Sequence, residues 1–288
     1  MAFDDAYGSL TDHDDDARWA YGTGFADPLA GVPTGIPDGV DPGDLAAYCL
    51  MLGDDALIMS HRLQEWVTRA PELEDEVAIA NIALDLLGQA RLLLTRAAEA
   101  EGEGRDEDAL AYRREAGEFR NVLLVERADP DFAHLVARLL VFATWRLAML
   151  DRLSGTRDPV LAAIGAKGVK EVTYHREYAA GWVVRLGDGT ELSHRRTQDA
   201  IDAVWPLTGE LFRPHEVEQR MGHEPSVLRA EFDAVITQVF EAATLRRPAE
   251  SAGAPAPSGG RDGVHTEAMA EILGELQGLA RSLPGGVW

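Results

Sequence analysis

Apolar residues recur every three or four positions along most of this 288-residue chain, and that spacing predicts helices. A first helix is expected to begin at Asp44, as its N-cap, with an apolar stripe through Leu45, Cys49, Leu52, Ala56, Met59, Leu63 and Trp66. Further helices are predicted over residues 71–101, 106–119, 129–154, 158–186, 193–212, 226–245 and 265–283. No stretch alternates apolar and polar residues in the way of a half-buried strand.

Local signals mark the expected ends of these helices. Asp129-Pro130 and Asp158-Pro159 each combine a capping carboxylate with a first-turn proline, and Gly102 follows the helix over residues 71–101. Long helices joined by short turns predict an all-α fold, an antiparallel four-helix bundle with additional helices. We expect residues 44–288 to form this domain, with a mobile loop at about 247–263. The Asp-, Gly- and Pro-rich leader of residues 1–43 is expected to be disordered.

The charge of the chain limits its partners. Forty-nine acidic residues against 27 basic ones give a formal net charge of -22, which disfavours nucleic acid and anionic membranes as partners. Cys49, the single cysteine, excludes an internal disulfide and reads as core filler. The N-terminus is acidic and lacks a long apolar run, so we expect no secretory signal, no membrane-spanning helix and a cytoplasmic location.

Two predicted helices carry polar groups on apolar faces. Asn81 and Asp85 are the only polar residues between Val77 and Gly88, and they lie one turn apart. A helix that is apolar on nearly all sides is expected to be buried, so Asp85 is expected to be buried and paired with a base such as Arg62, Lys167 or His175. In the helix over residues 158–186, His175 shares an apolar stripe with Gly165 and Gly168, with Glu171 one turn earlier. The two glycines indicate close approach of a neighbouring backbone.

These residues can be compared with the ligand set of a di-iron bundle. Such a site takes one carboxylate from each of two helices and Glu-x-x-His from each of the other two. The imidazole would be needed three residues after each carboxylate. Gly88 stands at that position after Asp85, and Tyr174 stands there after Glu171. The predicted helix over residues 129–154 has no acidic residue between Phe132 and Leu150. The literal Glu191-x-x-His194 follows a Gly-Asp-Gly turn, outside the middle of the bundle. A complete di-iron site is therefore not expected, and no metal-binding, cofactor-binding or catalytic residue is predicted.

Several runs of the chain resemble a known family. The runs over residues 52–66, 70–74, 80–91 (ANIALDLLGQAR), 121–126, 170–175, 185–190 and 265–267 resemble the C subunits of ring-1,2-phenylacetyl-CoA epoxidases, which are ferritin-like. The resemblance spans about residues 44–288. It implies a structural subunit that pairs with a catalytic A subunit of a complex that epoxidises phenylacetyl-CoA during phenylacetate degradation. It also implies that di-iron belongs to the A subunit, and NADPH, FAD and an iron–sulfur cluster to a reductase subunit.

On this interpretation a polar network of Glu65, Asn81, Asp85, Glu171 and His175 takes the place of an ancestral metal site. Two other functions remain open from the sequence. The chain could be a ferritin-like oxidase with an atypical di-metal site built from Glu65, Asp85, Glu171 and His175. It could also be a stand-alone helical module that binds an acyl-CoA, although its negative charge disfavours a polyanionic coenzyme.

Overall fold

A computed structural model describes residues 29–249 and 258–283, and those residues form helices without strands. The α-helices are α1 (Pro42–Gln64), α2 (Leu73–Glu101), α3 (Glu107–Tyr112), α4 (Phe132–Leu153), α5 (Pro159–Gly187), α6 (Glu191–Val204), α7 (Glu216–Arg220), α8 (Arg229–Ala242) and α9 (Ala268–Ser282). Short 3-10 turns are η2 (Ala116–Glu118), η3 (Leu123–Glu126), η4 (Trp205–Phe212), η5 (Pro225–Leu228) and η6 (Gly260–Asp262). The predicted all-α, ferritin-like fold is confirmed.

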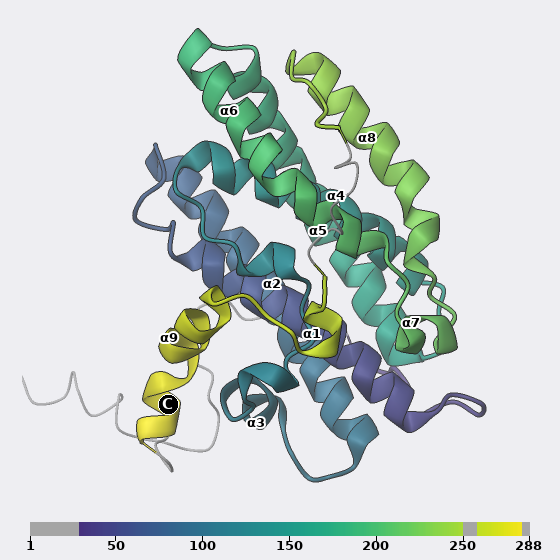
Figure 1. Ribbon diagram of the computed structural model, residues 1–288. Coiled ribbons are helices and arrows are strands. Elements are labelled where there is room, and N and C mark those ends of the chain that lie inside the picture. The colour runs from purple at the N-terminus through teal and green to yellow at the C-terminus, as the bar shows by residue number, and fades with distance from the viewer. Residues whose placement is uncertain (1–28, 250–257, 284–288) are drawn as a thin grey trace, which may run out of the picture.

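The bundle is built from two antiparallel pairs, α1 with α2 and α4 with α5, which meet along α2 and α5. In Figure 1, α6 and α8 lie along one side of these helices, and α3 and α9 lie on the other. Helix α4 is the centre of the fold, because its residues are buried on all sides from Leu135 to Leu150. Helix α2 was expected to be buried in this way, and that expectation is wrong, since Leu73, Val77 and Leu84 are exposed.

Caps explain most of the helix ends. Asp158 accepts a hydrogen bond from the backbone N–H of Leu161 at 2.8 Å and Pro159 opens α5, as predicted. Gly102 ends α2 in the left-handed conformation, with φ 67°. Two predicted starts are wrong. Asp41, not Asp44, caps α1, and Asp131 caps α4, because the carboxylate of Asp129 is held by Arg138 instead.

Parts of the leader and of the predicted loop lie against the bundle. Leu29, Val32, Ile36 and Val40 pack on the core, and the carbonyl of Thr34 accepts a hydrogen bond from Arg96 at 2.6 Å. Residues 29–43 therefore differ from the disorder expected for them, because their apolar side chains find the core. Residues 258–263 differ from the mobile loop in the same way, since Arg261 is buried. Residues 1–28 and 250–257 lie outside the described chain.

By length and composition alone, α2 and α4 could each cross a bilayer. Helix α4 is almost wholly enclosed by other helices, and the central helix of a bundle has this composition. Helix α2 buries one side against α1 and α5 and leaves the other side exposed. Two such helices are weak evidence for a membrane span.

Candidate functional site: the centre of the bundle

Two adjacent carboxylates of α1 lie fully buried in the bundle. Asp54 accepts hydrogen bonds from Arg114 Nη1 at 3.0 Å and from the backbone N–H of Arg120 at 2.8 Å. Asp55 accepts from Arg261 Nη1 at 3.0 Å and Nη2 at 2.8 Å, and from the backbone N–H of Val122 at 2.9 Å. Each acid is thus paired with a guanidinium and with a backbone donor, which is what a buried carboxylate requires.

Burial and pairing act against each other on the pKa of these groups. Burial raises the pKa of Asp55 and outweighs the lowering effect of Arg261. Burial also acts to lower the pKa of Arg261, but the charges of Asp55 and Glu218 raise it overall. The guanidinium of Arg261 therefore stays charged beside Asp55.

A series of hydrogen-bonded side chains joins three central helices, α4, α2 and α5. Arg146 of α4 donates from Nε to Gln89 Oε1 of α2 at 3.0 Å, and Gln89 donates to Glu171 Oε2 of α5 at 2.9 Å. Lys167, one turn before Glu171, forms an ion pair with the other oxygen of that carboxylate. Burial lowers the pKa of Arg146 to about 10, so this guanidinium is still protonated at neutral pH. The centre of the bundle therefore holds the buried Arg146, and Lys167 pairs with Glu171 from a partly exposed position on α5.

Asp85 and His175 form a separate pair. Asp85 Oδ2 lies 3.0 Å from His175 Nε2, which makes His175 the base among the three partners considered from the sequence. His175 is 1% exposed, but the side chain of Asp85 is 37% exposed. The expected burial of Asp85 is wrong, because nothing in the described chain covers the outer side of α2 at this level.

The structure divides the five residues of the predicted network. Asp85 meets His175, and Glu171 meets Gln89 and Lys167. Glu65 lies beyond the end of α1, where Arg62 donates to it at 2.6 Å, and Asn81 is exposed on α2. A single site containing all of these residues is not formed.

The residues at the bundle centre do not fit a di-iron centre. Four helices would have to present carboxylate and imidazole ligands there. Instead, α1 presents Asp55, which is already paired with Arg261, and α2 presents the amide of Gln89. Helix α4 presents the cation Arg146, and α5 presents Glu171, which is paired with Lys167. Fixed cations repel a metal ion and occupy the carboxylates that it would need.

One group of possible ligands is found elsewhere. Among residues 29–249 and 258–283, the only set of three His, Asp or Glu side chains close enough to share a metal ion is His61, Glu65 and Glu275. It joins the end of α1 to α9, away from the bundle centre. Glu275 is largely exposed, and Glu65 is already engaged by Arg62.

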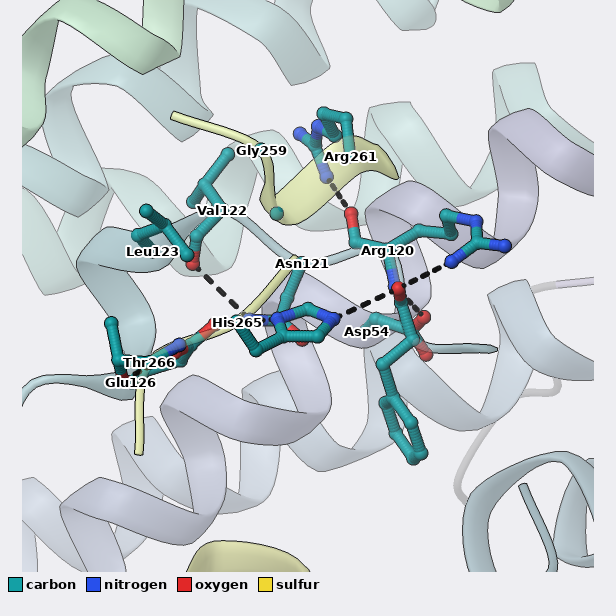
Figure 2. A network of polar contacts seen from close by, with 12 residues as sticks. Asp54, Arg120, Asn121, Val122, Leu123, Glu126, Gly259, Arg261, His265 and Thr266 are labelled. Carbon is teal, nitrogen blue, oxygen red and sulfur yellow. Dashed lines mark hydrogen bonds and ion pairs between the residues drawn. The ribbon is translucent and has the colours of Figure 1, made fainter. Parts of the chain in front are cut away.

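The segment over residues 258–266, here called the clasp, is inserted between α1 and residues 117–126. Figure 2 shows Arg261, His265 and Thr266 of the clasp turned toward residues 120–126. A Cβ at Gly260 would lie 2.1 Å from the carbonyl oxygen of Asn121, so only glycine fits there. The buried Glu126 accepts from the backbone N–H of Thr266 at 2.8 Å and lies 2.7 Å from His265 Nδ1.

The ring of His265 lies between two acceptors. Its Nδ1 faces Glu126 and its Nε2 is 3.0 Å from the carbonyl oxygen of Phe119, so only the doubly protonated imidazolium donates to both. Burial lowers the pKa of His265, but the hydrogen bond and charge of Glu126 outweigh burial and raise the pKa above its usual range.

A pH dependence follows from this raised pKa. The stabilisation is complete below the unfolded pKa of about 6.5 and is lost as the pH rises through the higher folded value. In urea unfolding we expect His265→Gln to cost about 1 kcal/mol at pH 6 and less at high pH. The wild type should lose that amount on alkalinisation, and the variant should not. Parallel pH profiles of the two proteins would contradict the prediction.

Comparison with known proteins identifies the family of this chain. The profile of the family described as Phenylacetic acid catabolic protein matches residues 39–288. The chain belongs to this family. Within the phenylacetic acid catabolic proteins, it is 46% identical over 249 residues to the C subunit of the 1,2-phenylacetyl-CoA epoxidase of Escherichia coli (strain K12). That alignment covers 85% of this chain and 99% of the relative, and it confirms the resemblance recognised in the sequence.

The main central residues of this phenylacetic acid catabolic protein were not found from its sequence. Asp54-Asp55 stands inside an apolar run of α1, and Arg146 is a charged residue in an apolar stretch of α4. Both are signals of the kind that identified Asp85. A di-iron ligand set requires acidic residues, however, and a search of this stretch for acidic residues alone does not reveal Arg146.

Proposed function

We propose that this chain is a supporting, non-catalytic subunit of a multicomponent epoxidase that acts on phenylacetyl-CoA. The observation that carries the proposal is the Arg146–Gln89–Glu171–Lys167 chain at the bundle centre. Helices α4 and α2 supply the buried cation of Arg146 and the amide of Gln89, where a di-iron enzyme would supply ligands, and Glu171 of α5 is already paired with Lys167. The name of the Escherichia coli relative, an epoxidase subunit, supports the assignment to this complex.

In this role the chain pairs with the catalytic subunit and holds its helices in place. Di-iron chemistry depends on ligands positioned to fractions of an ångström, so a rigid neighbour affects the activity. The buried ion pairs Asp54–Arg114, Asp55–Arg261 and Asp129–Arg138 make this bundle specific in its packing. On this proposal di-iron resides in the catalytic A subunit, NADPH, FAD and iron–sulfur chemistry in a reductase subunit, and the complex is cytoplasmic.

The test compares the chain purified alone, the catalytic subunit alone, and the pair. We expect less than about 0.1 iron per chain in the isolated protein, because its central carboxylates are already paired with Arg and Lys. We expect epoxidation by the catalytic subunit to rise at least about tenfold when the chain is added. Stoichiometric iron in the isolated chain, or full activity without it, would reject the proposal.

Substitutions separate this role from that of an atypical di-metal oxidase. Glu171→Gln keeps a hydrogen-bonding group opposite Gln89 but removes a potential metal ligand. The supporting role predicts that the pair containing this variant keeps its iron content and its activity within about twofold. An oxidase that uses Glu171 and His175 would lose both. Calorimetry with phenylacetyl-CoA on the isolated chain tests the acyl-CoA-binding alternative, for which we expect no heat of binding.

A further inference from the structure

Helix α2 presents an apolar face that the described part of the chain leaves uncovered. Leu73, Val77, Leu84 and Leu87 lie on one side of α2 and are 70%, 54%, 61% and 37% exposed, and Tyr174 of α5 is 48% exposed. The Asp85–His175 hydrogen bond places Tyr174 at the level of Leu84 and Leu87. These five residues are here called the α2 face. Large apolar side chains that are exposed together on one side of a protein mark interaction sites.

A glycine within this region provides a second, independent observation. Gly88 lies in the middle of a 29-residue helix, where glycine is unfavourable compared with alanine. Apart from the neighbouring residues and backbone of α2 itself, no described atom lies within 4 Å of the point that a Cβ at Gly88 would occupy. By contrast, a Cβ placed at Gly165 or at Gly168 would lie 3.0 Å or less from an atom of a neighbouring residue. Packing among the described residues therefore gives no reason for Gly88, whereas close approach by another helix does.

From these features we infer that the α2 face is the docking surface for an apolar helical face of the catalytic subunit. This inference rests on the proposed function, since it names the surface through which the two subunits pair. The face is apolar at its ends and carries Asn81 and the half-exposed Asp85 between them. A partner helix that packs over Gly88 and offers a hydrogen-bond donor to Asp85 matches this arrangement.

Charge favours this occupant over a second copy of the chain. Each copy carries a formal net charge of -22, and the first turn of α2 adds Glu74 and Glu76 near the end of the face. A two-fold interface would place the same acidic surface on both sides, which is electrostatically unfavourable.

Charge also argues against a lipid bilayer as the occupant. Helices that lie in a membrane surface carry Lys and Arg beside their apolar side. Between residues 73 and 90 α2 has no Lys or Arg, and Asn81 and Asp85 interrupt the apolar face. The opposite side of the helix is packed on α1 and α5, so α2 cannot insert without unfolding the bundle.

The test measures binding of the full chain to the catalytic subunit for Leu84→Asp and for a matched control. Val227→Asp is suitable, because Val227 is 55% exposed on η5, which packs against α4, α8 and η4. We expect Leu84→Asp to weaken the dissociation constant at least about thirtyfold, and Val227→Asp to leave it within about twofold. Both isolated variants should keep the thermal midpoint of the wild type, because both side chains are exposed.

Each other outcome has a definite meaning. If the wild type binds the catalytic subunit and Leu84→Asp binds equally well, the α2 face is not the docking surface, and the supporting role survives. If the wild type does not bind that subunit at all, the proposed function fails. Sedimentation showing a wild-type dimer that Leu84→Asp dissociates would assign the face to a second copy. Flotation with phosphatidylcholine–phosphatidylglycerol vesicles, abolished by Leu84→Asp, would assign it to lipid. Both results would overturn the inference.

Substitutions at Gly88 test the close approach itself. Gly88→Ala should raise the thermal midpoint of the isolated chain by about 2 °C, since alanine favours the helix. Gly88→Leu should leave the isolated chain folded but weaken binding to the catalytic subunit at least about tenfold, because the added side chain fills the space of the partner helix. Wild-type affinity in Gly88→Leu would overturn the inferred approach at this point.

Discussion

Replacing Arg261 by methionine is expected to lower the free energy of unfolding by about 3–5 kcal/mol, the cost of leaving a buried charge unpaired. Asp55 is 0% exposed and would keep only the backbone N–H of Val122 as a direct donor. The carbonyl oxygens of Met51 and Arg120 would each lose a hydrogen bond from the same guanidinium. Urea unfolding followed by circular dichroism measures the loss.

Two further variants test whether the lost stability comes from the unpaired carboxylate of Asp55. Adding Asp55→Leu to Arg261→Met removes the unpaired carboxylate and should recover much of the lost stability. The surface variant Arg195→Met breaks an exposed ion pair with Glu191 on α6 and should cost less than about 1 kcal/mol. A loss below about 1 kcal/mol in Arg261→Met would show that the clasp contributes little to the stability of the bundle.

Two glycines of α5 are expected to respond to alanine with opposite signs. A Cβ at Gly165 would lie 2.8 Å from the backbone nitrogen of Ser154 and 3.0 Å from the carbonyl oxygen of Leu150, neither of which can move freely. Gly165→Ala should therefore lower the free energy of unfolding by about 3 kcal/mol. At Gly181, on the same helix, no described atom outside the neighbouring part of α5 lies within 4 Å of the Cβ position. Gly181→Ala should raise the free energy by up to about 1 kcal/mol.

The same unfolding experiment measures both glycine variants. Because they share the helix and the chemical change, their difference reports the close approach of α4 to α5 alone. Equal effects of the two substitutions would contradict the packing described for the start of α5.

Local chemistry explains which parts of the fold could be predicted. The start of α5 depends on Asp158 and Pro159, adjacent in sequence, and the end of α2 depends on the left-handed Gly102. Both were predicted correctly. The start of α4 was misplaced because Asp129 is taken by Arg138, a tertiary contact that no capping rule contains. Close backbone approach was also predicted correctly at Gly165, whereas at Gly168 the close neighbour is the side chain of Leu150.

The candidate site was harder to predict, for a physical reason. Asp55 and Arg261 are 206 positions apart, and nothing near either residue indicates the other. The burial of Asp85 was misjudged because periodicity shows which side chains are apolar and not which side of a helix is covered. Only the pairing of Asp85 with His175, on the two helices that the sequence singled out, was among the predicted alternatives.

The buried cations of the bundle belong to the polypeptide itself, as Arg146 and Arg261, and Lys167 pairs with Glu171 nearer the surface. Metalloproteins that rely on bound ions to neutralise clustered acids lose their shape when those ions are stripped away. This bundle neutralises its central acids with its own side chains, so a chelator in the buffer should leave its unfolding curve unchanged. If the chain has the supporting role proposed above, it would fold in an iron-starved cell and be available there to bind the other subunits.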